Sequence, residues 1–447
     1  MQSRGQLPLR GSLPRRQFLA LTGALGLSTA LSACASTLPE PDVTRAGFGE
    51  SAKGTVRVWC RSATLAGVQV AVDRFHKSQD RIRVDLTPVL DSQYVTKLAT
   101  AIRGREVPDL VDIDDINSML FIYRDAFTDL TPLVEGLPFH DAISPGHLRL
   151  ATRKNRIYGI PYLADNSVLF YNRALFDRAG VDPAQSMTSF DGMLDAARKI
   201  RALGKDVYGW SIAGNSPGIL GFVVQPHVWA TGTDQIRGRI GFQRGHIEGN
   251  EPLRRTLEFY RTMWQEHLLP PANFADAGAT WGADFRAGQI GMLPANYAVG
   301  VLAADKSARA RTGVQLLSGP DGGSAFFDGG DNMCIPRGAR NASAAWAFAR
   351  FAISLRQQYQ LPVGGYSPIR SDILSDRFRA DYPLDVPPLR QIDKGYAPVT
   401  LAYNLLYNQA DSPWIAMFRR AVFTGDVDGA LARGQQAYDR ILTQSQL

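Results

Sequence analysis

Residues 55–113 constrain the fold more tightly than any other part of this 447-residue chain. Apolar residues alternate or cluster in three strand-like segments, and they recur at helical spacing in the two segments between them. In chain order the five segments are 55–60, 65–75, 82–86, 94–102 and 110–113. Strand, helix, strand, helix, strand is the signature of a parallel sheet with right-handed crossovers. The sequence therefore predicts an α/β fold.

Polar and aromatic residues follow the strands of this predicted sheet. Trp59 stands near the end of the first strand, and Asp114 and Asp115 follow the third. In open α/β sheets, ligands bind beyond the carboxyl ends of the strands. These three residues are therefore candidates for ligand contact. A helix N-cap or a solvated loop explains the two aspartates equally well, and both interpretations stay open.

Polar residues also interrupt apolar strands further along the chain. Asp165, Asn166 and Ser167 separate two apolar halves of the stretch 158–176, and similar interruptions occur near 295 and near 330. A buried strand has no reason to carry such residues unless they face water or a ligand. We predict that the chain crosses between two lobes at these three places, which then meet at one hinge and cleft. For the first stretch, an ordinary strand entered from a polar loop is the alternative.

Helical patterns between residues 168 and 290 supply a second lobe. The predicted fold class is thus α/β, with two lobes that are each a sheet flanked by helices. The predicted division is a signal segment at 1–33, a tether at 34–53, an N-terminal lobe from 54–164 and 295–328, and a C-terminal lobe from 168–290 and 331–447.

The start of the chain has the features of an export signal. Arg15 and Arg16 precede an apolar run that ends near residue 31, which is too short to span a membrane. The arginine pair resembles a twin-arginine signal, and the general secretory route stays open. Cys34 follows Leu-Ser-Ala, which resembles the lipobox of bacterial lipoproteins, whose cysteine is acylated. A plain secretory signal with a chance cysteine is the alternative.

Charge and cysteine content narrow the classes of partner. The formal net charge is +7, but the first 33 residues hold four arginines and no acid, which leaves +3 for the remainder. Because the basic residues form no cluster, we expect no nucleic-acid binding. Cys60 and Cys334 lie far apart in sequence, and whether they pair stays open.

Signals for catalysis or metal binding are missing from the sequence. The six histidines have no paired spacing, and no Cys or His cluster has the spacing of metal ligands. Neither Gly-x-Ser-x-Gly nor His-Glu-x-x-His occurs. Asp114 and Asp115 are adjacent and would point to opposite faces, which does not suit a glycosidase pair. We therefore predict a binding protein, not an enzyme, with no metal and no cofactor.

Several motifs occur in a recognisable order along the chain. They are VRVW at 56–59, GREVPDLV at 104–111, YGIP at 158–161, LFYNRALF at 169–176, FRAGQIGM at 285–292 and GGYSP at 364–368. Together they resemble the family 1 extracellular solute-binding proteins of bacterial ABC importers, a group that includes maltose-binding protein. The resemblance implies a two-lobed lipoprotein that closes on a ligand and delivers it to a membrane permease. At 296–297, Asn-Tyr replaces the Gly-x-Trp that is common in the family, which leaves the ligand's identity open.

For a sugar ligand, aromatic faces and hydroxyl-binding side chains are needed. The candidates are Trp59, Tyr94, Asp114, Asp165, Asn166, Trp281, Asn296, Tyr297, Gly329, Gly330, Asp331 and Tyr366. Position along the resemblance favours Tyr94, Asp114, Asn166, Asn296, Gly330 and Tyr366. Asn166 is preferred to Asp165 because neighbours on an extended segment cannot both face the cleft. Trp281 serves equally well as a core residue.

We predict that the ligand is a saccharide. The runner-up is a glycerophosphodiester or another phosphorylated polyol, for which Arg61 or Arg370 would hold the anionic group, although surface solvation explains both arginines more simply. A secreted carbohydrate-active enzyme is a remote alternative. The expected partners are the transmembrane subunits of an ABC permease and, through a lipid on Cys34, the outer side of the cell membrane. We expect a monomer.

Overall fold

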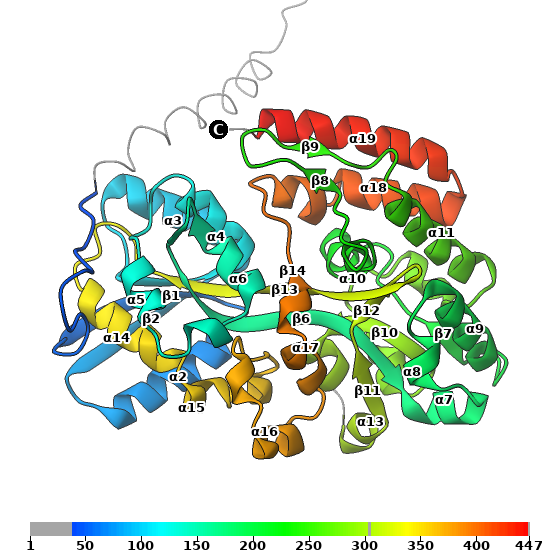
Figure 1. Ribbon diagram of the computed structural model, residues 1–447, viewed down its shortest axis with the longest axis horizontal. Helices are drawn as coiled ribbons and strands as arrows, with labels where there is room; N and C mark the ends of the chain where they lie inside the picture. Colours follow the sequence, from blue (N-terminus) through cyan, green and yellow to red (C-terminus); the bar gives the residue numbers. More distant parts are fainter. Residues whose placement is uncertain (1–37, 303–304, 446–447) are drawn as a thin grey trace, which may run out of the picture.

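The computed structural model describes residues 38–302 and 305–445, and it shows two lobes side by side (Figure 1). The predicted signal segment and Cys34 lie outside the described residues. In the part that the structure describes, no helix is both long and apolar enough to cross a membrane. The predicted two-lobed α/β architecture is confirmed, and Figure 1 shows two long strands passing through the middle of both lobes.

One mixed sheet runs through the molecule. In the described residues its main path has the order β2-β1-β3-β13-β6-β10-β7, and β11, β12 and β14 pair at its sides. The strands are β1 (Gly54–Arg61), β2 (Ile82–Val89), β3 (Leu110–Asp114), β6 (Ile160–Asn172), β7 (Tyr208–Trp210), β10 (Ile290–Asn296), β11 (Thr312–Gln315), β12 (Leu317–Gly319), β13 (Gly322–Cys334) and β14 (Gly395–Tyr396). Strands β1, β2 and β3 are parallel, as the sequence predicts.

Strands β6 and β13 join the lobes. They run antiparallel, and the residue pair Asp165–Gly329 lies near their middle. On the N-terminal side β13 also pairs with β3, whereas on the C-terminal side β6 pairs with β10 and β11. The crossings predicted near 165 and near 330 are therefore present.

Helices flank both halves of the sheet. In the N-terminal lobe they include α2 (Leu65–Ser78), α3 (Asp91–Gly104), α4 (Asp115–Ile122), α5 (Thr131–Glu135), α6 (Pro145–Leu150), α14 (Ala342–Ala352) and α15 (Leu355–Gln358). In the C-terminal lobe they include α7 (Arg173–Ala179), α8 (Pro183–Ser186), α9 (Phe190–Arg201), α10 (Pro217–Trp229), α11 (Glu251–Gln265), α12 (Ala283–Arg286), α13 (Lys306–Ala310), α18 (Pro413–Arg419) and α19 (Val427–Gln444). The short helices α16 (Asp376–Asp381) and α17 (Val386–Arg390) lie below the middle of the molecule in Figure 1.

The division of the chain between the lobes differs from the prediction. Residues 295–328 belong to the C-terminal lobe, because β11 pairs with β6 and Ala325 and Phe326 join that lobe's core. Helix α14 belongs to the N-terminal lobe, where Trp346 packs in the same cluster as Val56 and Val68. The polar break near 295 is not a crossing. The third connection runs instead from Arg370, which bridges to Ile143, to Gly395, which pairs with Phe326.

Part of the predicted tether is packed against the N-terminal lobe. Leu38 and Val43 are buried in that lobe's apolar clusters. The Gly338 amide donates to the Pro39 carbonyl at 2.8 Å, and Arg337 forms an ion pair with Glu40 at 2.9 Å. The flexible tether expected at 34–53 is therefore wrong for residues 38–53, because scattered apolar residues in a Ser- and Pro-rich segment are enough to anchor it.

The two described cysteines are free and buried. Strand β3 separates β1, which carries Cys60, from β13, which carries Cys334. The two thiols also belong to different apolar clusters. The question that the sequence leaves open is thus answered, and no disulfide joins them.

Candidate functional site

A cavity of about 400 Å³ lies between the lobes, at the middle of the crossing strands. Both lobes and both crossing strands contribute side chains to it. Its lining residues are Arg61, Asp114, Asp115, Ile116, Asp165, Ser167, Ile219, Phe222, Gly278, Trp281, Asn296, Val299, Phe327, Gly329 and Gly330. A concave site that combines apolar side chains with a few convergent polar groups is the usual form of a small-molecule site.

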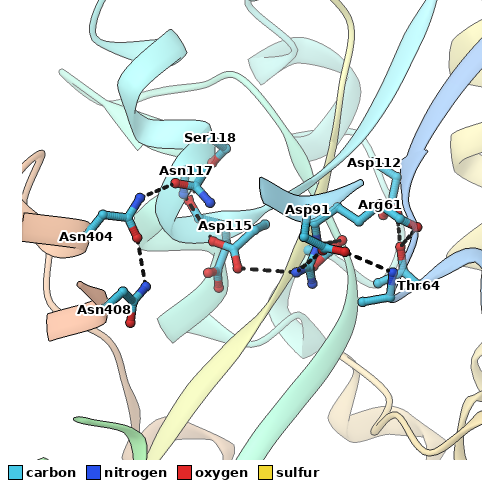
Figure 2. Close-up of polar contacts among 12 residues, drawn as sticks. Arg61, Thr64, Asp91, Asp112, Asp115, Asn117, Ser118, Asn404 and Asn408 are labelled. Carbon is cyan, nitrogen blue, oxygen red and sulfur yellow. Dashed lines mark hydrogen bonds and ion pairs between the residues drawn. The ribbon is translucent and has the colours of Figure 1, made fainter. Parts of the chain in front are cut away.

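The wall of the cavity on the side of the N-terminal lobe carries Arg61, Asp114 and Asp115, and we call it the N-terminal wall. Arg61 is its cation. It stands at the end of β1, and its Nε donates to the Asp331 carboxylate at 2.9 Å. Its Nη1 lies 3.1 Å from Asp91 (Figure 2). The same Nη1 lies 3.7 Å from Asp114. The Asp331 side chain is fully buried, whereas that of Arg61 keeps 18% exposure. The guanidinium is therefore already surrounded by carboxylates of the protein.

Two consecutive aspartates begin helix α4 on the same wall. Asp114 caps the helix, and its carboxylate accepts a hydrogen bond from the Asn117 amide at 3.2 Å. Asp115 is fully buried, and neither of its carboxylate oxygens has a hydrogen-bond partner. Its nearest cation is His147, whose Nε2 lies 4.0 Å away. Burial raises the pKa of Asp115 well above its usual range.

A further carboxyl, Asp112, lies behind this wall. It is fully buried and accepts a hydrogen bond from the Thr64 hydroxyl at 2.6 Å (Figure 2). Burial first, and then the neighbouring Asp331 carboxylate, raise the pKa of Asp112 well above its usual range. The N-terminal side of the cavity thus concentrates more carboxyl groups than cations.

The crossing strands form the floor of the cavity. Asp165 and Ser167 of β6 line it, whereas Asn166 between them points to the opposite face of the strand. Burial raises the pKa of Asp165 to about 6. A Cβ on Gly330 would come within 2.1 Å of the Leu163 carbonyl oxygen, so only glycine fits at this point of the crossing.

A buried ion pair supports the floor from below. His147 Nδ1 lies 3.0 Å from Asp328, and Nε2 lies 2.9 Å from the Gly329 carbonyl oxygen. The Ser144 hydroxyl donates to the same Asp328 carboxylate at 2.5 Å. Burial opposes protonation of His147, but the Asp328 carboxylate and its hydrogen bond outweigh burial and raise the pKa to about 9. The imidazolium is therefore held in place beneath Gly329 at neutral pH.

The C-terminal wall has a different chemistry. It is formed by Ile219 and Phe222 of α10, with Trp281, Val299 and Phe327. The rings of Phe222 and Phe327 pack with their centroids 4.6 Å apart. This wall offers aromatic and aliphatic surface, which suits the C–H faces of a ligand.

Half of the candidate ligand contacts from the sequence line the cavity. These are Asp114, Asp165, Trp281, Asn296, Gly329 and Gly330. Asp115 and Ser167, which the sequence places at a strand end and in a polar interruption, line the cavity as well. The lining residues that sequence reasoning missed include Ile219, Phe222, Val299 and Phe327. Helix α10 is apolar on all sides, so nothing in its sequence distinguishes Phe222 from the core residues beside it.

Several other candidates lie outside the cavity. Tyr94 is a buried residue of α3, and its hydroxyl donates to the Trp59 carbonyl at 3.1 Å. The centroid of the Trp59 ring lies 4.6 Å from Lys97 Nζ. The Tyr366 hydroxyl donates to the Ala63 carbonyl at 2.7 Å. Tyr297 is 8% exposed and packs within the C-terminal core.

Asn166 and Asp331, two further candidates for ligand contact, do not line the cavity either. Asn166 faces away, because the alternation of β6 gives Asp165 and Ser167 the cavity side. Asp331 acts as the buried partner of Arg61 and does not line the cavity. Arg370 is also buried elsewhere, with bonds to Asp372 and its guanidinium 3.5 Å from the Phe139 ring centroid. Solvation at the surface is thus the wrong explanation for both arginines.

A chain of asparagines connects the lobes beside the cavity. Asn404 of the C-terminal lobe donates to the Asn117 side chain of α4 at 2.8 Å, and Asn408 donates to Asn404 at 2.7 Å (Figure 2). Ile116 and Met119 of α4 also join the apolar cluster of the C-terminal lobe. Helix α4 therefore makes direct contact with both lobes.

Metal binding has no geometric support in the part of the chain that the structure describes, because no three His, Cys, Asp or Glu side chains there come together in a suitable arrangement. Asp91, Asp114 and Asp331 form ion pairs with Arg61 instead.

Comparisons with known proteins agree with this architecture. Residues 70–385 match the protein family described as "Bacterial extracellular solute-binding protein". The arabinooligosaccharide-binding protein of Bacillus subtilis (strain 168) is 25% identical over 173 residues, which are 38% of this chain and 37% of that protein. The sn-glycerol-3-phosphate-binding periplasmic protein UgpB of Pectobacterium atrosepticum is 22% identical over 145 residues, 31% of this chain and 32% of the relative. The chain thus matches less than half the length of these curated relatives.

Solved structures share the fold across nearly their whole length. The sugar-binding protein MalE of Xanthomonas citri has a TM-score of 0.77 at 21% identity, and the alignment covers 88% of this chain and 98% of that one. The cyclic alpha-maltosyl-1,6-maltose binding protein of Arthrobacter globiformis has a TM-score of 0.72 at 21% identity, over 88% and 100% of the two chains. At 21% identity, the similarity to these two solved structures establishes a shared fold and nothing further.

Proposed function

The chain belongs to the bacterial extracellular solute-binding proteins, and on this premise we propose that it captures a carbohydrate between its lobes for an ABC importer. The observation that carries the proposal is the contrast between the two walls of the cavity. One wall presents Asp114 and Asp115, and the other presents Phe222 and Trp281. A sugar has hydroxyls on the edge of its ring and apolar C–H faces, so it needs both kinds of surface.

The charge of the cavity disfavours a phosphorylated ligand. Arg61 is the one cation among the lining residues, and it is already in contact with Asp331, Asp91 and Asp114. A phosphate would have to displace these carboxylates and would also face Asp165. Like charges at short range in a partly desolvated site repel strongly. Although one relative is named for sn-glycerol-3-phosphate, this cavity supports a neutral or cationic ligand.

The proposal extends to the location of the protein and its partners. Members of this family act outside the cytoplasm, and the lipobox-like sequence before Cys34 supports a lipid anchor at that residue. The mature chain would then be tied to the outer side of the cell membrane, next to the transmembrane subunits of the permease. We propose that it acts there as a monomer and as a binding protein without catalysis. Mass spectrometry of the mature N-terminus in the native host tests the anchor, and an unmodified Cys34 contradicts it.

A thermal-shift screen tests the choice of ligand class. A ligand that binds only the folded state at 100 times its Kd stabilises it by about 2.7 kcal/mol, enough to raise the melting temperature measurably. The panel consists of neutral mono- and oligosaccharides, amino sugars, sugar phosphates and glycerophosphodiesters. We expect a shift with at least one saccharide and none with the phosphorylated compounds. A shift confined to the phosphorylated compounds overturns the carbohydrate proposal.

A further inference from the structure

Resting on the carbohydrate function proposed above, we propose that the ligand is a sugar or polyol carrying a protonated amine, and that Asp115 is the counter-ion of that amine. This deepens the proposed function, because it selects one chemical class among carbohydrates.

Asp115 is the first observation that points to such a ligand. It lines the cavity and is fully buried, yet both carboxylate oxygens lack hydrogen-bond partners. Most buried polar side-chain atoms in proteins have a partner, and an unpartnered carboxylate is especially costly. The neighbouring His147 does not fill this role, because its Nε2 lies 4.0 Å away and 2.9 Å from the Gly329 carbonyl oxygen. A donor from the ligand would satisfy Asp115.

The charge balance of the cavity indicates that this donor is a cation. Asp114, Asp115 and Asp165 line the cavity against the single cation Arg61. Arg61 is engaged by Asp331, which lies behind the wall and is fully buried. Three lining carboxyls thus share a space whose one cation already has a carboxylate partner. An ammonium between them would restore the balance, whereas a hydroxyl would supply a hydrogen bond without charge.

Proton linkage gives the proposal a second signature. Asp115 is faced by His147 from α6, by Asp114, and by Asp328 and Asp331 from β13. Asp165 is faced by Arg61, Asp331, Asp114 and Asn296. Burial raises the pKa of both carboxyls, to about 6 for Asp165. An ammonium beside them favours their ionised forms, so a cationic ligand should release protons when it binds at mildly acidic pH.

Matched ligands that differ only at carbon 2 of the ring test the proposal. The probes are glucosamine, N-acetylglucosamine and glucose, the same three in the galacto configuration, and the β-1,4-linked disaccharides of glucosamine, N-acetylglucosamine and glucose. Isothermal titration calorimetry at pH 6.5 measures each Kd. We expect at least one amine to bind about tenfold or more tightly than its N-acetyl and hydroxyl counterparts, with a preference that weakens as salt is added.

Variants assign the preference to Asp115. In Asp115→Asn, the ratio of amine to hydroxyl affinity should fall at least about fivefold, which corresponds to roughly 1 kcal/mol. Asp195→Asn removes a carboxylate from the outer surface of α9, so it controls for net charge and should leave the ratio unchanged. If Asp115→Asn does not fold, proton release by the wild-type protein, measured in two buffers of different ionisation enthalpy, takes its place.

The outcomes separate this inference from the proposed function. Binding of hydroxyl or N-acetyl sugars as tightly as their amines overturns the inference and leaves the carbohydrate proposal standing. A preference for amines that survives in Asp115→Asn, or amine binding without proton release, also overturns it. Failure of every saccharide in the wider screen, with binding of another class, overturns both.

Discussion

The two walls of the cavity differ in chemistry because they come from different parts of the fold. The N-terminal wall is built where β1 and β3 end, and it carries Arg61, Asp114 and Asp115. The C-terminal wall is built from the side of α10 and from loops, and it carries Phe222 and Trp281. Ends of parallel strands collect polar groups, whereas a helix packed against a sheet presents apolar ones. The ligand is therefore expected to turn its polar edge to one lobe and its apolar face to the other.

Removing the cation of the charged wall should have the largest effect. Arg61→Ala leaves the buried Asp331 carboxylate without its partner, and breaking a buried pair in this way costs about 3–5 kcal/mol of unfolding free energy. Urea denaturation measures the change. The double variant Arg61→Met/Asp331→Asn should recover most of the loss.

An exposed arginine provides the control for this prediction. Arg198 forms a bidentate pair with Glu266 on the surface, and its side chain is 47% exposed. Arg198→Ala should cost no more than about 1 kcal/mol. An Arg61→Ala variant that is no less stable than Arg198→Ala would contradict the buried ion pair as described.

Two buried histidines should give pH dependences of opposite sign. The pKa of His147 is raised to about 9 at the charged floor, with Asp328 outweighing burial. The stability that it contributes is fully present below about pH 6.5, the unfolded value, and is lost as pH rises toward 9. Burial lowers the pKa of His227, in the core of the C-terminal lobe, to about 4. Its contribution is lost instead as pH falls from about 6.5 toward 4.

Thermal denaturation from pH 4 to pH 9.5 checks this pair of slopes. His147→Gln should flatten the alkaline side of the stability profile, and His227→Gln should flatten the acidic side, each by an amount on the order of a few kcal/mol. The same slope changed by both variants would contradict the assigned environments.

On the C-terminal wall, Phe222→Ala removes aromatic surface from the cavity. The variant should therefore bind a saccharide identified in the screen about tenfold more weakly, which corresponds to roughly 1.4 kcal/mol of binding free energy. Phe242→Ala is the matched control, since that ring lies on the same lobe, is 68% exposed and does not line the cavity. Calorimetry compares the two. Equal losses of affinity would remove the C-terminal wall from the site.

The contact between the lobes should have the smallest effect. Asn404→Ala removes the hydrogen bond to Asn117 and should shift the balance toward an open form by about 1 kcal/mol. Small-angle scattering without ligand would then show a larger radius of gyration. Asn408 bonds to Asn404 within one lobe, so Asn408→Ala should leave the radius closer to that of the wild type.

Much of the fold follows from sequence, and the site follows only in part. The parallel strands β1 to β3 can be recognised in the sequence, because apolar residues alternate or cluster in them and recur at helical spacing in the segments between them. Asp114 could therefore be placed at a strand end. The choice between Asp165 and Asn166 depends on which face of β6 meets the cavity, and alternation alone does not fix that parity. The polar break at Asn296 lies at the edge of the cavity, but the chain does not cross between the lobes there. A polar break at a cavity edge and a polar break at a crossing have the same sequence pattern.

Other parts of the site have no local signal at all. Phe222 lies in an apolar helix where every turn looks like core. Arg61 and Asp331 are 270 residues apart in sequence, and their ion pair exists only because β13 returns beside β3. Such pairings depend on the order of strands in the sheet, which a single sequence does not reveal.

A crystal structure with the tightest-binding saccharide from the screen would show which wall of the cavity contacts which face of the sugar. We expect a sugar between the lobes, with its hydroxyls or amine toward Asp114, Asp115 and Asp165 and a C–H face against Phe222 and Trp281. A sugar bound outside this cavity, or bound in it with its polar edge toward Phe222, would contradict the account.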